Sequence, residues 1–134
     1  MKKTIMIIGG GLLQAPLIST AKKMGCQVIV TDYNPEAIGM KDADIPITMS
    51  TRDIQGSVRI AKQQNEITPI HAVLTAGTDA SMTVAAVANA LNLTGIKFED
   101  AEAATNKIKM RMRFKEQGVA SPAFLPVWTL ADAK

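Results

Sequence analysis

The sequence has few of the residues that form disulfides and zinc sites. Cys26 is the only cysteine and His71 the only histidine among 134 residues. An intrachain disulfide is therefore excluded, and a zinc site of the usual cysteine–histidine kind has too few donors. We expect Cys26 to be a small core residue, because no catalytic base accompanies it. A chain with one cysteine fits the reducing cytoplasm, which is its expected location.

Aromatic residues and long apolar runs are also scarce. Aromatic residues make up 4% of the chain, which gives few platforms for stacking on single-stranded nucleic acid. No stretch approaches the ~20 apolar residues that a membrane-spanning helix needs. The N-terminus superficially resembles a secretory signal, but Gly9–Gly11 and Gln14 interrupt its apolar run, so a buried strand explains it better. We therefore predict a protein without a nucleic-acid or membrane partner.

The net charge of +3 is concentrated in one segment. Five basic residues lie between positions 107 and 115, which leaves ten basic against twelve acidic residues elsewhere. The basic character is therefore local, and the overall charge does not indicate a nucleic-acid partner.

The remaining composition, with 47% apolar residues, fits one packed domain. Short β-branched runs alternate with segments of helical periodicity, and Asp53 is suited to cap one helix. This alternation predicts right-handed βαβ units, hence an α/β fold with an open, mostly parallel sheet and helices on both faces. The expected strands are Thr4–Ile8, Gln27–Thr31, Ile45–Thr48 (at an edge because of Pro46) and His71–Thr75 (buried), and the expected helices cover about 13–24, 54–65, 80–91 and 99–117.

The last helix and the tail are less regular. Residues 108–115 alternate apolar and basic, which by period alone is a strand, but their residue types and the preceding segment favour a helix that Gly118 ends. Ala123–Trp128 is expected to be one more extended segment. Thr129 is suited to cap a further helix.

The first candidate site is the glycine-rich turn between the first strand and the first helix. Gly9, Gly11, Leu12 and Gln14 lie where a ligand approaches the backbone and the helix N-terminus of a parallel α/β sheet. Asp32 follows at the end of the second strand, where a ribose-binding acid would stand. Gln14 replaces the third glycine of the dinucleotide fingerprint, which favours a small anionic or carboxylate ligand over NAD(P). A tight turn without a ligand remains the alternative.

The second candidate site is Gly77–Thr78–Asp79, again between a strand and a helix. Thr78 or Asp79 could simply cap the helix. Alternatively, Gly77, Thr78 and Asp79 line the same crevice as the glycine turn, because neighbouring strands of a doubly wound sheet end side by side.

The chain resembles the N-terminal, Rossmann-like domain of ATP-grasp ligases, such as carbamoyl phosphate synthetase large subunit, biotin carboxylase and the purine-pathway enzymes. The resemblance covers essentially the whole chain. It rests on the Gly-x-Gly turn, on Asp32 followed by Asn34–Pro35, and on Ala43–Asp44. Its more specific part is the junction motif formed by the following residues: Asn106–Lys107, Met110–Arg111 and Gly118–Phe124.

The resemblance implies a role for each segment. Residues 1–122 would form the pre-ATP-grasp domain, and residues 123–134 would begin the ATP-grasp domain. Lys107 would bind the nucleotide phosphates, whereas a solvated helix face is the alternative for the basic run. ATP and Mg²⁺ would be cofactors of the complete enzyme only, since the metal ligands of the family lie beyond the motifs found here. Leu13–Gln14 departs from the acidic residue of purine-pathway members, so their particular substrate is not implied.

The expected activity is that of a substrate-side domain of a carbamoyl phosphate synthetase-like carboxylate–amine ligase that works through an acyl phosphate. Its expected partners are a small carboxylate or phosphate substrate, an ATP-grasp domain in the same or another chain, and a second copy in a homodimer. Because the motifs stop early, we expect a fragment of a longer enzyme that is not catalytic alone. A stand-alone small-molecule or nucleotide-binding module, and less so an NAD(P)-binding domain, are the alternatives.

Overall fold

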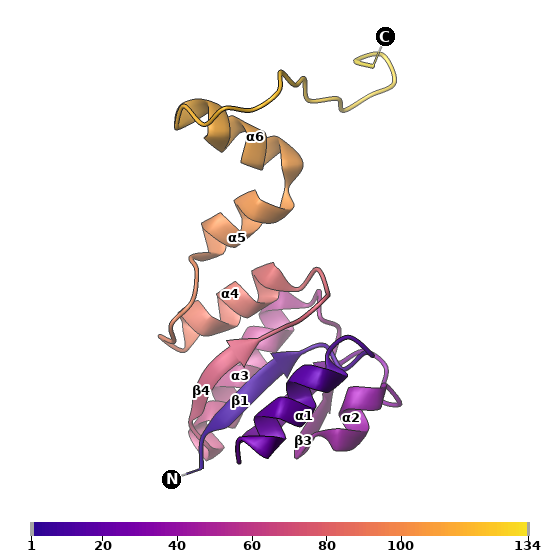
Figure 1. Ribbon diagram of the computed structural model, residues 1–134, viewed down its shortest axis with the longest axis vertical. Helices are drawn as coiled ribbons and strands as arrows, with labels where there is room; N and C mark the ends of the chain where they lie inside the picture. Colours follow the sequence, from indigo (N-terminus) through magenta and orange to yellow (C-terminus); the bar gives the residue numbers. More distant parts are fainter. Residues whose placement is uncertain (1, 134) are drawn as a thin grey trace.

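The computed structural model describes residues 2–133, in which strands and helices alternate through the first two thirds of the chain (Figure 1). The elements are β1 (Thr4–Ile8), α1 (Ala15–Lys23), β2 (Gln27–Asp32), α2 (Ile38–Asp42), β3 (Ile45–Thr48), α3 (Ile54–Ile67), β4 (Ile70–Leu74), α4 (Ser81–Ala90), α5 (Phe98–Thr105) and α6 (Lys107–Glu116).

The four strands form a parallel sheet in the order β3-β2-β1-β4. Successive residues of β1 and β2 point to opposite faces, and both faces are covered. Met6, Ile8 and Ile29 pack with α3 and α4, whereas Ile7 and Val30 pack with α1 and α2. The predicted α/β class, with a parallel sheet between two helical layers, is therefore confirmed.

Several local predictions are confirmed by the helix and strand ends. Pro16 lies in the first turn of α1, and the Asp53 carboxylate caps α3 by accepting a hydrogen bond from Gly56 N at 2.9 Å. Pro46 lies on β3 at one edge of the sheet, where its missing N–H disturbs no strand pairing. The short helix α2 was not predicted, because Pro35 and Gly39 break its helical pattern.

Two predictions about the secondary structure of residues 2–117 were wrong. β4 was expected to be buried, but it is the second edge strand, and its residues His71 and Leu74 are exposed. The expected helix 99–117 is broken into α5 and α6 at Asn106, whose side chain accepts hydrogen bonds from two N–H groups of the next turn. Asparagine favours such capping over the helix interior.

The C-terminal part leads away from the sheet (Figure 1). α5 packs against α4, and α6 packs against α5, but no residue of α6 is buried. Ala123–Trp128 forms no strand, and the turn after Thr129 is not a helix. Met1 begins the first expected domain and Lys134 ends the second, and both lie outside the described residues. None of the helices in residues 2–133 has the length and apolarity to cross a membrane.

Candidate functional site

The loops that follow the four strands meet at the carboxyl ends of the strands and line an open crevice with many polar residues. It consists of two cavities of about 750 and 290 Å³ that share Tyr33, Thr51, Gly77 and Thr78 in their walls. The glycine turn lines the smaller cavity, and the loop after β3 lines the larger one. The crevice therefore lies where open α/β sheets bind their ligands.

The glycine turn is held to the end of β2. Gly9 N donates to Thr31 O at 2.7 Å, and Gly10 N donates to Asp32 Oδ2 at 2.8 Å. A Cβ added at Gly10 would lie 3.2 Å from both Met40 and Val30 side chains. Two N–H groups of the turn are thus used inside the protein, and a side chain at position 10 would be tightly packed against Met40 and Val30.

Asp32 also braces the next loop. Its Oδ1 accepts a hydrogen bond from Asn34 N at 2.9 Å, so each carboxylate oxygen holds one backbone N–H. The side chain lies at the wall of the smaller cavity, and the residue is 8% exposed. This bracing accounts for the acidic residue at the end of β2 without a bound ribose.

Gln14 joins two of the loops. The residue is 4% exposed, and its Nε2 donates a hydrogen bond to Ala76 O in the loop after β4. Gly77 completes the junction: its φ of +62° is accessible to glycine, and a Cβ there would lie 2.7 Å from Leu13 Cδ1. Gln14 therefore fills the space between the glycine turn and the β4–α4 loop. Leu12 is exposed at the cavity wall.

Thr78 and Asp79 do not cap α4. The N-cap residue is Ala80, and no side chain caps this helix. Both residues line the larger cavity, and Thr78 also lines the smaller one. The structure thus brings Gly77, Thr78 and Asp79 beside the glycine turn, as the sequence indicated.

Four residues that line the larger cavity were missed by the sequence analysis: Tyr33, Ser50, Thr51 and Arg52. The loop after β3 is tied down by Met49 N, which donates to Asp32 O at 2.8 Å, and by Thr83 Oγ1, which donates to Thr51 O at 2.6 Å. The available signal was positional, because this loop also follows a parallel strand.

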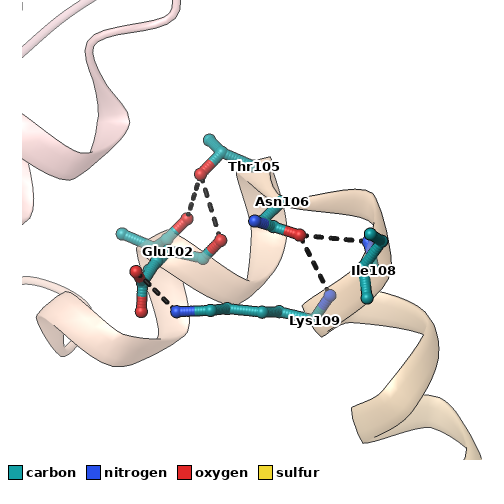
Figure 2. A network of polar contacts seen from close by, with 6 residues as sticks. Glu102, Thr105, Asn106, Ile108 and Lys109 are labelled. Atoms are coloured by element: carbon teal, nitrogen blue, oxygen red, sulfur yellow. Dashed lines mark hydrogen bonds and ion pairs between the residues drawn. The ribbon is translucent and has the colours of Figure 1, made fainter. Parts of the chain in front are cut away.

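Lys107 does not line this crevice. It is the exposed first residue of α6, in the part of the chain that leads away from the sheet. Figure 2 shows how this helix begins: Asn106 Oδ1 accepts hydrogen bonds from Ile108 N and Lys109 N, both at 3.1 Å. Lys109 reaches back to Glu102 at 2.6 Å, and this ion pair joins α5 to α6.

No metal site is formed by the described residues. Residues 2–133 contain no group of three or more histidine, cysteine, aspartate or glutamate side chains that could hold an ion.

Comparison with known proteins gives structural matches only, because no family model and no curated protein matches the sequence. The L-amino acid ligase of Bacillus licheniformis is 25% identical with a TM-score of 0.76, over 98% of this chain and 34% of that one. N5-carboxyaminoimidazole ribonucleotide synthetase of Thermotoga maritima is 25% identical with a TM-score of 0.70, over 98% and 35%.

A third match is the biotin carboxylase domain of the 2-oxoglutarate carboxylase from Hydrogenobacter thermophilus, solved as a dimer with MgADP and bicarbonate. It is 17% identical with a TM-score of 0.62, over 88% of this chain and 28% of that one. The chain thus spans about a third of these ligases. Residues 2–133 have the fold of an N-terminal, Rossmann-like domain of the ATP-grasp ligases, as the sequence resemblance implied.

Proposed function

We propose that this chain is the substrate-side domain of an ATP-dependent carboxylate–amine ligase of the ATP-grasp family. The observation that carries the proposal is the polar crevice at the carboxyl ends of the strands, in a fold shared with ATP-grasp ligases about three times as long. The glycine turn (Gly9, Gly11, Leu12 and Gln14), Asp32 and Gly77–Asp79 would form the wall against which the substrate lies.

The exposed apolar residues in the C-terminal part of the chain support the proposal of a further domain. Leu125, Trp128 and Leu130 are 85%, 74% and 78% exposed, and α6 buries nothing. Large apolar side chains gathered on one short segment favour burial against a partner. In the proposed enzyme an ATP-grasp domain, in the same or another polypeptide, covers this segment and brings the nucleotide phosphates to Lys107.

The reaction class is the two-step activation of a carboxylic acid. A carboxylate oxygen attacks the γ-phosphorus of ATP, and ADP leaves with the electron pair of the broken P–O bond. The amine nitrogen then attacks the carbonyl carbon of the acyl phosphate, loses a proton, and inorganic phosphate leaves. The described residues would orient the acceptor and exclude water from the acyl phosphate. ATP and Mg²⁺ would be bound by the complete enzyme.

The test is made on a polypeptide that joins this chain to its ATP-grasp domain. ADP release should depend on the carboxylate substrate, and hydroxylamine should trap the acyl phosphate as a hydroxamate. Lys107→Ala should raise the KM for ATP, whereas Lys115→Ala, at the exposed end of the same helix, should not. Unchanged ATP kinetics in Lys107→Ala would remove the role assigned to Lys107. A lack of substrate-dependent ADP release would remove the ligase.

A binding module without catalysis is the second candidate. One observation favours it: the residues that line the crevice lie between positions 9 and 79, so α5, α6 and the segment after them contribute nothing to its wall in the described part of the chain. Such a module would bind its ligand without ATP and would be functional without another domain. The dimeric biotin carboxylase match is compatible with a homodimer in either case.

A further inference from the structure

The larger cavity of the crevice has two opposite charges in its wall. Arg52 comes from the loop after β3, and Asp79 comes from the loop after β4. The ion pairs found in residues 2–133 involve neither of them, so their charged atoms are more than 4.0 Å apart. The wall of the cavity therefore contains a basic and an acidic residue that form no ion pair with each other.

Arg52 is displayed by a firmly held loop. Its backbone N–H donates to Ser50 Oγ at 3.2 Å, and Thr51 O accepts from Thr83 on α4. The neighbouring carboxylate of Asp53 is used to cap α3 at Gly56 N. The guanidinium is thus left to meet a ligand, and its planar fork matches a carboxylate or phosphate.

Asp79 is left without a protein partner in the same way. The helix that follows it is capped by no side chain, and within the described part of the chain its carboxylate accepts no hydrogen bond. Hydroxyl groups of Tyr33, Ser50, Thr51 and Thr78 share the cavity wall with the two charges. These groups can donate to an anion or accept from an ammonium group.

We propose that this cavity binds a small dipolar ligand, with its carboxylate or phosphate group on Arg52 and its ammonium group on Asp79. The inference rests on the proposed function, because it names the substrate class of the same crevice. A ligand of one sign would pair with only one of the two groups and would be repelled by the other, which has the same sign as the ligand. A nucleoside triphosphate is disfavoured for the same reason, because its negative charges would face Asp79.

The test is a titration of the isotope-labelled chain, followed by the amide resonances of the crevice loops. O-phosphoethanolamine and β-alanine present an ammonium group with a phosphate and a carboxylate, respectively. Inorganic phosphate, propionate and ethylamine present one charged group each. We expect at least one dipolar compound to bind about tenfold more tightly than each single-charge compound, which corresponds to about 1.4 kcal/mol. The tighter of the two identifies the anionic group.

Two variants make the assignment specific. Arg52→Gln and Asp79→Asn should each weaken binding of the dipolar compound about tenfold, and Asp79→Asn should leave the affinity for the plain anion equal or improved. Arg59→Gln and Glu66→Gln, exposed on α3 outside the cavity, are the matched controls. Because Arg52 and Asp79 are exposed, we expect an unchanged urea midpoint for both crevice variants.

Three results would overturn the inference: no binding of either dipolar compound, equal affinity for the plain anions, or full binding in Asp79→Asn. These measurements need no ATP. If they fail while the complete polypeptide still releases ADP with its substrate, only the dipolar ligand is wrong. If they succeed while no ligase activity is found, the binding-module function takes its place.

Discussion

The chain consists of two regions that differ in how much they bury. The body, from β1 to α4, encloses a parallel sheet whose residues Met6, Ile7, Val28 and Ile29 are fully buried. The extension, from α5 to residue 133, buries only Ala101 and Ala103, against α4. The body has a core of its own and carries the crevice, whereas the extension is held by caps and ion pairs. In the proposed enzyme, the body would provide the binding site, and the extension would provide contacts for another domain.

The largest expected difference between the regions is the cost of removing an apolar side chain. Ile29→Ala in β2 should lower the free energy of unfolding by about 2–5 kcal/mol, because it leaves a cavity beneath α3 and α4. Met112→Ala in α6, where the residue is 51% exposed, should change it by less than about 0.5 kcal/mol. Urea unfolding measures both. A comparable loss in the two variants would show that the extension is part of the core.

The second largest difference between the regions is expected when a glycine in each is replaced by alanine. A Cβ on Gly39 would lie 2.4 Å from Ile18 Cδ1 and 2.8 Å from Gly10 O, so Gly39→Ala should cost about 1–3 kcal/mol by overpacking. It should also disturb the glycine turn, because Gly39 N donates to Gly10 O at 2.7 Å. Gly118→Ala meets no atom within 4 Å, although φ there is +66°. We expect it to fray the end of α6 and to leave the unfolding midpoint unchanged; an equal shift in both would contradict this.

A side-chain helix cap can be removed from each region by one substitution. Asp53→Ala removes the cap of α3 and should lower global stability by about 1 kcal/mol. Asn106→Ala removes the cap of α6 and should speed hydrogen exchange in residues 107–116 without changing the global unfolding free energy. If Asn106→Ala lowered the urea midpoint as much as Asp53→Ala, the two regions would unfold as one.

The smallest expected effect is electrostatic. The Lys22 ammonium, 2.9 Å from Asp44, and the Val28 N–H hold the pKa of the Asp44 carboxyl below its usual value of 3.8. A depressed pKa gives stability that is present above pH 3.8 and is lost as pH falls through the lower, folded pKa. Asp44→Asn should therefore lower the free energy of unfolding by less than about 1 kcal/mol at pH 7. It should lower it by close to nothing at a pH below the folded pKa of Asp44.

Asp42→Asn, beside it on the surface, is the control for the Asp44 titration. In the extension, hydrogen bonds from Trp128 N and Thr129 N likewise lower the pKa of Asp132. Its protonation should open a local turn without moving the global midpoint. The opposite result would be a pH dependence of global stability that is lost in Asp132→Asn and kept in Asp44→Asn. It would show that the extension, and not the body, sets the acid stability of the chain.

The sequence predicted the body better than the extension for physical reasons. Apolar periodicity reports burial, so β1, β2 and α3 could be located, and the caps Asp53 and Gly118 marked helix ends. The break at Asn106 could not be found by periodicity, because α6 has no buried face to produce one.

The crevice was predicted in the same uneven way. Strand-end glycines located two of its loops, whereas the loop of Arg52 follows a four-residue edge strand and contains no glycine. The bracing roles of Asp32 and Gln14 depend on partners 22 and 62 residues away, Gly10 N and Ala76 O, which only the fold brings together. For Lys107 the resemblance supplied a role but no position.

We propose that this chain holds a substrate crevice and that another domain binds most of the nucleotide. The most direct test is a titration of the labelled chain with MgATP, followed residue by residue. We expect no saturable change at the glycine turn or at Arg52, and only weak, non-saturating contact near Lys107. Saturable binding of MgATP at Gly9–Gln14 would contradict it and make the crevice itself the nucleotide site.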